Sequence, residues 1–559
     1  MFIYRITRTG ILWMMLCCVL YACSLSPAQT APTIPHAGNN YRVAGTVVNK
    51  IDGHPLPRTR VILRDTKESD KFESLVTGDD GKFAFNAIPA GKYSLAGTKR
   101  GYITAAYDQH DQFSTAIVTG ADLDTENLVL RLAPAAVISG KILDESGEAV
   151  RHASVTAYFD DHSSGVDQVR QARGTQTDDL GAYELPSLNP GTYFLSVDAK
   201  PWYAIHPAST PPNSGKESDP ASSTTFDRSL DVAYPLTYYP DVTDADSAMP
   251  IPIRGGERIQ VDIHLTPVPS LHLLFRVPTD KNNGFAVPQL EQPSFDGATP
   301  RATDSAQFVS PGLVEITGIP AGRYNLRLNG SGPAIQMNGL DFSKDGEEID
   351  TTNAEALGSV KVSAQVRGEA ALPERLTVGL GSSHRGPIVW KEFDAKGEAD
   401  LEQVPPGRYD VFIWGPPRPY SIAKLSAEGA SASGRTLTVP AGAAASLSLI
   451  VAGGSRKIDG TAKRAGKPFA GAMVVLVPRD PEINHDLFRR DQSDLDGTFT
   501  LQNVVPGTYT VLAIENGWDL DWSQPGVIAA YVRHGHTIEV GQQGGSAMKL
   551  ADPVEVLSK

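Results

Sequence analysis

The chain has 559 residues, 41% of them hydrophobic and 20% charged, which suits several globular domains and excludes a largely disordered chain. Its net charge of −14 argues against nucleic acid as a partner and against electrostatic docking to anionic lipid, since both need a basic surface. The 52 Gly and 41 Pro residues indicate many turns.

The N-terminal segment has the pattern of an export signal, predicted over residues 1–28. Arg5 and Arg8 precede a short apolar run, 11–22, which is too short to span a bilayer. Two cleavage sites stay open. Leu20-Tyr21-Ala22-Cys23 resembles a lipobox, with Tyr21 unusual in it, and would leave Cys23 lipidated, whereas Ser26-Pro27-Ala28 suits ordinary signal peptidase and would leave Gln29 first. We expect an exported protein of the periplasm, the outer membrane (if lipidated) or the extracellular space.

Cysteine usage supports this division into leader and body. Cys17, Cys18 and Cys23 are the only cysteines, and all lie in the export segment, so the mature body has no disulfide, thiol nucleophile or Cys-ligated metal. No second apolar stretch is long enough for a transmembrane helix. Any membrane contact would therefore pass through a lipid on Cys23.

One small construction recurs five times along the body. A Gly stands twelve residues before a Tyr, and a second Gly stands two residues before the same Tyr. The Gly–Tyr pairs are Gly81 and Tyr93, Gly181 and Tyr193, Gly312 and Tyr324, Gly397 and Tyr409, and Gly497 and Tyr509. Aliphatic or aromatic residues recur at fixed positions between and after them, so the repeat indicates one structural unit used five times.

The unit predicts a specific local structure. The first Gly closes a hairpin with positive φ, alternating apolar residues form a half-buried strand, and a Pro/Gly turn leads to the Tyr that opens the next strand. We expect the Tyr ring in the core and its hydroxyl on a nearby backbone group. Further strands precede each turn, as in VAGTVV from Val43, and follow it, as in LVLRL from Leu128.

Six or seven short strands in each stretch of about 100 residues predict an all-β fold, a tandem array of about five small antiparallel Ig-like or transthyretin-like β-sandwiches. The expected order is a linker, 29–40, five repeats and a tail, 553–559. The repeats are 41–133, 134–266 with a long loop insertion at 206–240, 267–355 (degenerate), 356–452 and 453–552. We expect an extended rod or a bent array.

The G-x-V start, the D-D-x-G-x-F type of turn and the P-G-x-Y turn together resemble carboxypeptidase regulatory-like domains, the transthyretin-like sandwich appended to metallocarboxypeptidases. The segment Tyr234–Pro240 and the GGERIQVDIHL that follows resemble multi-copy exported proteins of acidobacterial type. Related sandwiches are classed with carbohydrate-binding-like folds. That resemblance implies a shape and does not establish a ligand.

Several aromatic residues are candidate ligand-binding positions. Trp518, Trp522, Trp202 and Tyr102 lie at or near the position nine residues after the anchor Tyr, and Tyr238 and Tyr239 lie in the insertion. Their rings suit stacking on sugars. The alternative, which we favour, is that they seal sandwich ends or pack on neighbouring domains, and that the insertion covers the edge of its own sandwich.

Catalytic patterns are lacking in the sequence. There is no H-x-x-E zinc pair, G-x-S-x-G elbow, P-loop or dinucleotide fingerprint, and His534-Gly535-His536 is interpreted as a surface turn. We expect no enzyme, metal or cofactor. The predicted function is binding, adhesion or scaffolding at the cell envelope, with a polysaccharide or an envelope protein as possible partner. The alternatives are a carbohydrate-binding protein and an accessory array for an enzyme or transport system on another chain.

Overall fold

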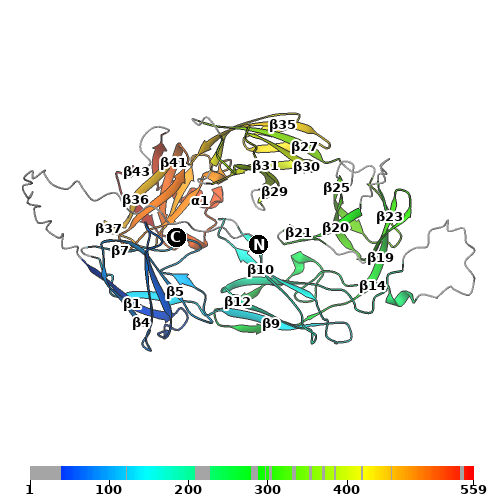
Figure 1. Ribbon diagram of the computed structural model, residues 1–559, viewed down its shortest axis with the longest axis horizontal. Coiled ribbons are helices and arrows are strands. Elements are labelled where there is room, and N and C mark those ends of the chain that lie inside the picture. Colours follow the sequence, from blue (N-terminus) through cyan, green and yellow to red (C-terminus); the bar gives the residue numbers. More distant parts are fainter. Residues whose placement is uncertain are drawn as a thin grey trace, which may run out of the picture.

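The protein is described by a computed structural model that covers residues 40–120, 123–165, 167–207, 227–277, 287–295, 297–300, 305–329, 335–351, 356–367, 372–382, 386–416, 420–454, 456–541 and 547–559. The predicted export segment, with both cleavage sites and Cys23, lies outside the described residues. Nearly all of the regular secondary structure in the described chain is β-strand, which confirms the all-β fold class (Figure 1).

Five main hydrophobic cores of the described residues follow one another along the chain and define five units, and a second, smaller core lies within unit five. Unit one is centred on Val43–Leu132, unit two on Ala136–Leu265, unit three on Leu271–Ile349, unit four on Val360–Val451 and unit five on Ile458–Val556. Each core lies between two layers of strands, as expected for a sandwich. We propose that the domain boundaries fall between these cores, as the sequence predicts.

Units one and two are each built from short strands. Unit one contains β1 (Tyr41–Asn49), β2 (Arg60–Asp65), β3 (Phe72–Val76), β4 (Lys82–Ile88), β5 (Gly91–Thr98), β6 (Ala105–Ala106), β7 (Ile117–Thr119) and β8 (Leu128–Leu132). Unit two contains β9 (Ala136–Leu143), β10 (Ser154–Asp161), β11 (Gln168–Gln176), β12 (Ala182–Leu188), β13 (Gly191–Asp198), β15 (Thr237–Tyr238), β16 (Ile251–Ile253), β17 (Arg258–Gln260) and β18 (Ile263–His264).

Units three and four are also built from short strands. Unit three contains β14 (Val232–Ala233), β19 (Val268–Arg276), β20 (Val287–Ser294), β21 (Gly297–Pro300), β22 (Ser305–Ser310), β23 (Leu313–Pro320), β24 (Gly322–Asn329), β25 (Ile335–Phe342) and β26 (Glu348–Asp350). Unit four contains β27 (Gly358–Val366), β28 (Thr377–Ser382), β29 (Gly386–Glu392), β30 (Glu398–Val404), β31 (Gly407–Trp414), β32 (Tyr420–Glu428), β33 (Ser431–Ser433), β34 (Thr436–Val439) and β35 (Ala444–Gly453).

Unit five carries the one α-helix of the described residues, α1 (Pro525–Val532). Its strands are β36 (Arg456–Arg464), β37 (Lys467–Pro468), β38 (Met473–Pro478), β39 (Arg489–Gln492), β40 (Thr498–Val504), β41 (Gly507–Ile514), β42 (His536–Val540), β43 (Ala547–Lys549) and β44 (Val554–Leu557). No helix in the described ranges is long and apolar enough to cross a bilayer.

One pairing pattern is shared by all five units. The opening strand lies between an antiparallel neighbour, the strand after the first repeat turn, and the closing strand, which runs parallel to it. In unit one these are β4, β1 and β8. The parallel pair was not predicted, because alternation of side chains is the same in parallel and antiparallel strands.

The anchor tyrosines behave as predicted. Each ring is buried, and each hydroxyl donates to the carbonyl four residues earlier, across the Pro/Gly turn. The bonds run from Tyr93 to Pro89 (3.1 Å), Tyr193 to Asn189 (3.0 Å), Tyr324 to Pro320 (2.8 Å), Tyr409 to Pro405 (2.6 Å) and Tyr509 to Val505 (2.7 Å). One side chain therefore fills the core and fixes the turn that precedes it.

The predicted turn glycines all have positive φ. The values are 68° at Gly81, 68° at Gly181, 79° at Gly312, 80° at Gly397 and 75° at Gly497. A second left-handed position, six residues before each Tyr, was missed because four of its five residues are not Gly. These are Ala87, Ser187, Gly318, Gln403 and Asn503, and each lies where the strand pairing shifts register.

The insertion of unit two covers its own sandwich, as predicted, and also reaches the next unit. Strand β15 pairs with β13, and Tyr234 and Tyr238 are buried, at 2% and 1% exposure. The preceding strand β14 instead pairs with β19 of unit three. Residues 208–226 of the insertion lie outside the described part of the chain.

The units form a closed circuit rather than a rod, so the expectation of an extended rod is wrong (Figure 1). Phe295 of unit three packs on Tyr158, Phe194 and Tyr238 of unit two. Arg327 bonds Gln403 between units three and four, and Arg435 pairs with Asp486 between units four and five. Unit five then contacts units one and two. Sequence repeats show that units follow one another, but the path of the array depends on contacts between units.

The repeat turn predicts the outcome of a matched pair of substitutions in unit two. Gly181 (φ +68°) and Gly147 (φ +80°) are both left-handed, but an added Cβ would lie 2.7 Å from the Ile142 carbonyl oxygen at Gly181 and has open space at Gly147. Gly147→Ala should cost about 1 kcal/mol from backbone strain, and Gly181→Ala about 3 kcal/mol because of the added clash. Urea denaturation of both variants measures this difference. Equal losses would contradict a steric role for the Gly181 turn.

Candidate binding site at the junction of units one, two and five

The first repeat turn of unit five docks on unit one where the circuit closes. Asp494 opens the first turn of unit five, and its carboxylate accepts from the Ala116 amide (2.9 Å) and from Lys92 Nζ (2.5 Å) of unit one. The Leu495 amide donates to the Ala116 carbonyl (3.1 Å). At the equivalent position of units two and four, Asp178 and Asp394 bond only within their own turns. The same turn residue thus serves as a local cap in two units and as an inter-unit contact in unit five.

Arg490 on β39 joins three units. Its guanidinium donates to Asp111 Oδ2 of unit one (3.2 Å) and to the Ser163 carbonyl of unit two (2.8 Å), and lies 4.2 Å from the ring centre of Trp522 in unit five. The side chain is 5% exposed, and burial lowers the pKa of Arg490. A buried cation needs this full set of partners, so its position depends on all three units being in place.

Polar and aromatic contacts extend the junction around Arg490. Gln492 Nε2 donates to the Asp108 carbonyl (2.6 Å) and to Thr115 Oγ1 (2.8 Å) of unit one. Trp518 stacks on His110 with ring centres 4.9 Å apart and planes 5° from parallel. Unit one therefore contributes a polar and an aromatic surface that unit five covers.

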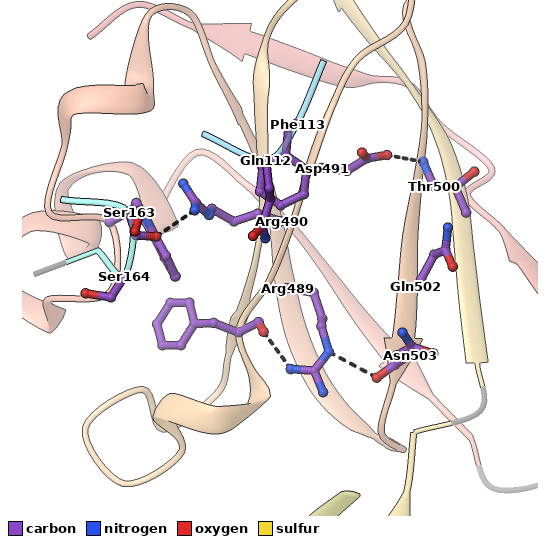
Figure 2. Close-up of a pocket in the computed structure, with 12 residues that line it drawn as sticks. Gln112, Phe113, Ser163, Ser164, Arg489, Arg490, Asp491, Thr500, Gln502 and Asn503 are labelled. Atoms are coloured by element: carbon purple, nitrogen blue, oxygen red, sulfur yellow. Dashed lines mark hydrogen bonds between the residues drawn. The ribbon is translucent and has the colours of Figure 1, made fainter. Parts of the chain in front are cut away.

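A cavity of about 500 Å³ opens at this junction (Figure 2). Residues of three units line it: Gln112, Phe113, Ser163, Ser164, Phe488, Arg489, Arg490, Asp491, Thr500, Gln502, Asn503 and Trp522. This volume lies within the range of small-ligand sites. The cavity exists only in the closed circuit, because its wall residues come from chain segments almost 400 residues apart.

The cations of the cavity are engaged by the protein itself. Arg489 donates to the carbonyls of Asp486 (2.7 Å), Phe488 (2.7 Å) and Asn503 (3.0 Å), and Arg490 is held as described above (Figure 2). The side-chain amides of Gln112, Gln502 and Asn503, in contrast, make no hydrogen bond to any residue in the described ranges. The wall therefore presents neutral donors and acceptors beside aromatic rings.

Asp491 is the acidic group of the cavity. Its Oδ2 accepts from the Thr500 amide (2.7 Å), and burial raises the pKa of Asp491 to about 6 (Figure 2). The neighbouring Asp494 carboxylate adds to this rise, while Lys92 opposes it. The carboxyl thus changes charge in the mildly acidic range.

The structure brings two of the six predicted aromatic positions to this site. Trp522 lines the cavity at 9% exposure, and Trp518 packs beside it against unit one. Tyr102 and Tyr239 pack against the cores of units one and two, and Tyr238, 1% exposed, has no ring face open to a ligand. Trp202 is 80% exposed and lies away from the junction, with Tyr203 edge-on to it.

Another exposed aromatic surface was missed in the sequence. On unit four, Trp390 (64% exposed) and Phe412 lie opposite Gly379 on the two flanking strands, and Trp414 (38% exposed) follows on β31. The alternation of Trp390, Phe412 and Trp414 along strands β29 and β31 was the available signal, since residues two apart share a face.

Comparison with known proteins identifies the first part of the chain. Residues 42–130 and 137–208 match the carboxypeptidase regulatory-like domain. Units one and two are therefore similar to carboxypeptidase regulatory-like domains. This confirms, for these two units, the resemblance drawn from the turn motifs, which unit five carries as clearly. No curated protein matches the sequence.

Solved structures with similar β modules have low identity. The Bacillus anthracis TIE protein is 10% identical over 74% of each chain, with a TM-score of 0.17. A streptococcal ancillary pilin is 12% identical over 56% of this chain and 98% of its own, with a TM-score of 0.21. Two B repeat units of the Staphylococcus aureus collagen-binding protein are 10% identical over 74% and 99%, with a TM-score of 0.12. These scores are too low to show a shared overall arrangement.

Arg490→Leu tests whether this side chain holds the circuit closed. Loss of the guanidinium leaves Asp111 without its cation and should weaken the junction by about 2–5 kcal/mol. The Leu495 amide, which bonds across the junction, should then exchange with deuterium at least 10-fold faster, and the radius of gyration in X-ray scattering should rise. Arg100→Leu, at an exposed position of unit one, is the control. Unchanged exchange at Leu495 would show that Arg490 is dispensable for closure.

The raised pKa of Asp491 predicts that the difference in stability between the wild type and Asp491→Asn depends on pH. Because its folded pKa, about 6, lies above the ordinary 3.8, its protonation stabilises the folded state fully below pH 4, and this contribution is lost as pH rises through 6. Asp491→Asn, which keeps an acceptor for Thr500, should have a free energy of unfolding about 3 kcal/mol above that of the wild type at pH 7.5 and close to it near pH 4. Urea denaturation of unit five at both pH values measures this, with the exposed Asp70→Asn as control. A difference in the free energy of unfolding between variant and wild type that is the same at both pH values would contradict the raised pKa of Asp491.

Proposed function

We propose that this protein is a non-catalytic binding and scaffold protein of the cell envelope. Its five sandwiches form a closed frame, and the cavity of units one, two and five is its ligand site. The observation that carries this proposal is the free set of amides, Gln112, Gln502 and Asn503, beside aromatic rings in a cavity whose cations are already engaged.

The ligand that fits this wall is a neutral saccharide. Amides donate and accept at once, which matches the hydroxyl groups of a sugar, and the Phe113 and Phe488 side chains add apolar wall that suits its C–H groups. A phosphate or carboxylate ligand would need a cation with free donors, and Arg489 and Arg490 donate to protein oxygens instead. Partner proteins of the envelope, or an enzyme or transport system on another chain, would contact the outer surfaces of the frame.

The proposed place of action follows from the sequence of the leader. Export would release the body into the periplasm or beyond, and lipid on Cys23 would hold it at the outer membrane. The intact mass of the mature protein separates the two cleavage sites. A chain that begins at Gln29 carries no anchor.

The ligand proposal is tested with a double variant, Gln502→Ala with Asn503→Gly. The Gly keeps the left-handed backbone of Asn503 (φ 62°) while removing its amide. Saturation-transfer NMR with a panel of neutral oligosaccharides should detect binding to the wild type and a loss of at least 10-fold in affinity for the variant. Ser187→Gly, the equivalent position of unit two (φ 60°), is the matched control and should bind as the wild type does.

Two results would contradict the ligand site. Absence of binding to every neutral oligosaccharide at millimolar concentration would exclude the saccharide. Binding that survives the double variant and is lost in Trp390→Ala would place the saccharide on the aromatic face of unit four instead.

A further inference from the structure

A cluster of metal-ligand side chains lies in the turn between β10 and β11 of unit two, next to unit five. Asp160, His162 and Asp167 each offer one ligand atom, and these atoms lie within 4.8 Å of one another. Asp167 contacts His162 Nδ1, and Asp160 Oδ2 lies 4.0 Å from Nε2. Asp521 of unit five brings a further carboxylate, with Oδ1 3.7 Å from His162 Nδ1.

The cluster differs from its surroundings in charge balance. The adjacent acids are neutralised by the protein, since Asp161 pairs with Arg170 (3.5 Å) and Asp519 with Lys559 (2.5 Å). Asp160, Asp167 and Asp521 have no Lys or Arg ion pair among the described residues, and His162 is the one side chain of possible positive charge that they share. Three carboxylates around one imidazole therefore leave negative charge uncompensated at the boundary of two units.

A second observation concerns His162 itself. Its Nδ1 is shielded from solvent and, within the described ranges, makes no hydrogen bond of proper geometry, although carboxylates of two units face it. A shielded ring nitrogen without a hydrogen bond is costly unless it binds a proton or a metal ion.

We infer that Asp160, His162 and Asp167, together with Asp521, form a binding site for a divalent transition-metal ion such as Zn²⁺ that links unit two to unit five. Zinc binds imidazole nitrogen and carboxylate oxygen at about 2.0–2.2 Å, which places two ligand atoms about 3.3 Å apart, within a small adjustment of the spacing observed. A mixed nitrogen and oxygen set favours Zn²⁺ or Mn²⁺ over Ca²⁺ and Mg²⁺, which prefer oxygen alone.

The ion would act at the junction without being part of the saccharide site. The same turn continues into Ser163 and Ser164, which line the cavity, and into Gly165, whose carbonyl accepts from the Ser523 amide of unit five (3.3 Å). A metal bridge between the turn and Asp521 would therefore slow the opening of this inter-unit contact, whether or not a ligand fills the cavity.

Metal titration of the full chain, freed of any histidine tag and of bound metal by chelation, tests the site. Competition with a chromophoric chelator should show one Zn²⁺ per chain, weaker Mn²⁺ and no competing Ca²⁺ or Mg²⁺. His162→Ala and the exposed Asp167→Asn should each lower Zn²⁺ affinity at least 10-fold. His534→Ala, in the surface turn of unit five, is the control and should bind as the wild type does. Equal affinity in the wild type and both site variants, or no Zn²⁺ bound, would overturn the site.

A separate measurement tests whether the ion links unit two to unit five. Zn²⁺ should slow deuterium exchange of the Ser523 amide in the wild type and not in Asp167→Asn, and Asp521→Asn should weaken Zn²⁺ at least 10-fold. If Zn²⁺ binds with unchanged exchange at Ser523 and unchanged affinity in Asp521→Asn, the ion belongs to unit two alone and the bridge is refuted. Circular dichroism of each metal-free variant confirms that a loss of affinity is not a loss of fold.

Discussion

The buried guanidinium of Arg490 is the interaction on which the closed architecture depends. It bonds a carboxylate of unit one and a carbonyl of unit two, and it packs over a tryptophan of its own unit. Removing such a cation from water is favourable only when every partner is present. Closure is therefore close to all-or-none: the three units meet with the full set of bonds, or Arg490 remains hydrated and the junction stays open. The cavity, the exposure of Trp518 and the position of Asp521 all follow from that one state.

Two residue types set the conformation of the turns in each repeat unit. The turn Gly sets the hairpin through positive φ, and the anchor Tyr joins the core to the Pro/Gly turn through one hydrogen bond. Apart from this pair and the recurring core residues, most positions differ between the units. Unit five illustrates this: its turn aspartate, Asp494, bonds another unit, and the segment after its Tyr strand forms α1 and carries Trp522.

Local features of the fold were predictable from sequence, and inter-unit features were not. The five Gly–Tyr pairs predict five sandwiches, and the structure confirms the role of every anchor Tyr. The left-handed position at Ala87 and its equivalents gave no signal, because an alanine or glutamine does not mark positive φ. The path of the array, the cavity and the His162 cluster depend on residues such as Arg490 and Asp521 meeting partners more than 300 positions away, and no periodic pattern encodes such a meeting. The burial of Tyr238 follows equally from a neighbour, Phe295 of unit three.

The distance in sequence between unit one and the unit-five turn that docks on it affects how the protein folds during synthesis. Lys92 and Asp494 are 402 residues apart, so unit one is synthesised long before its partner surface is. During that interval unit five does not yet cover the face that carries His110 and Phe113. Chaperones and other nascent chains can then reach this face. The polar groups on this face, among them Thr115 and Asp108, keep it hydrated until unit five arrives. A junction built largely from hydrogen bonds and one stacked ring pair thus tolerates a long delay between the synthesis of unit one and that of unit five. A purely apolar junction would favour aggregation before closure.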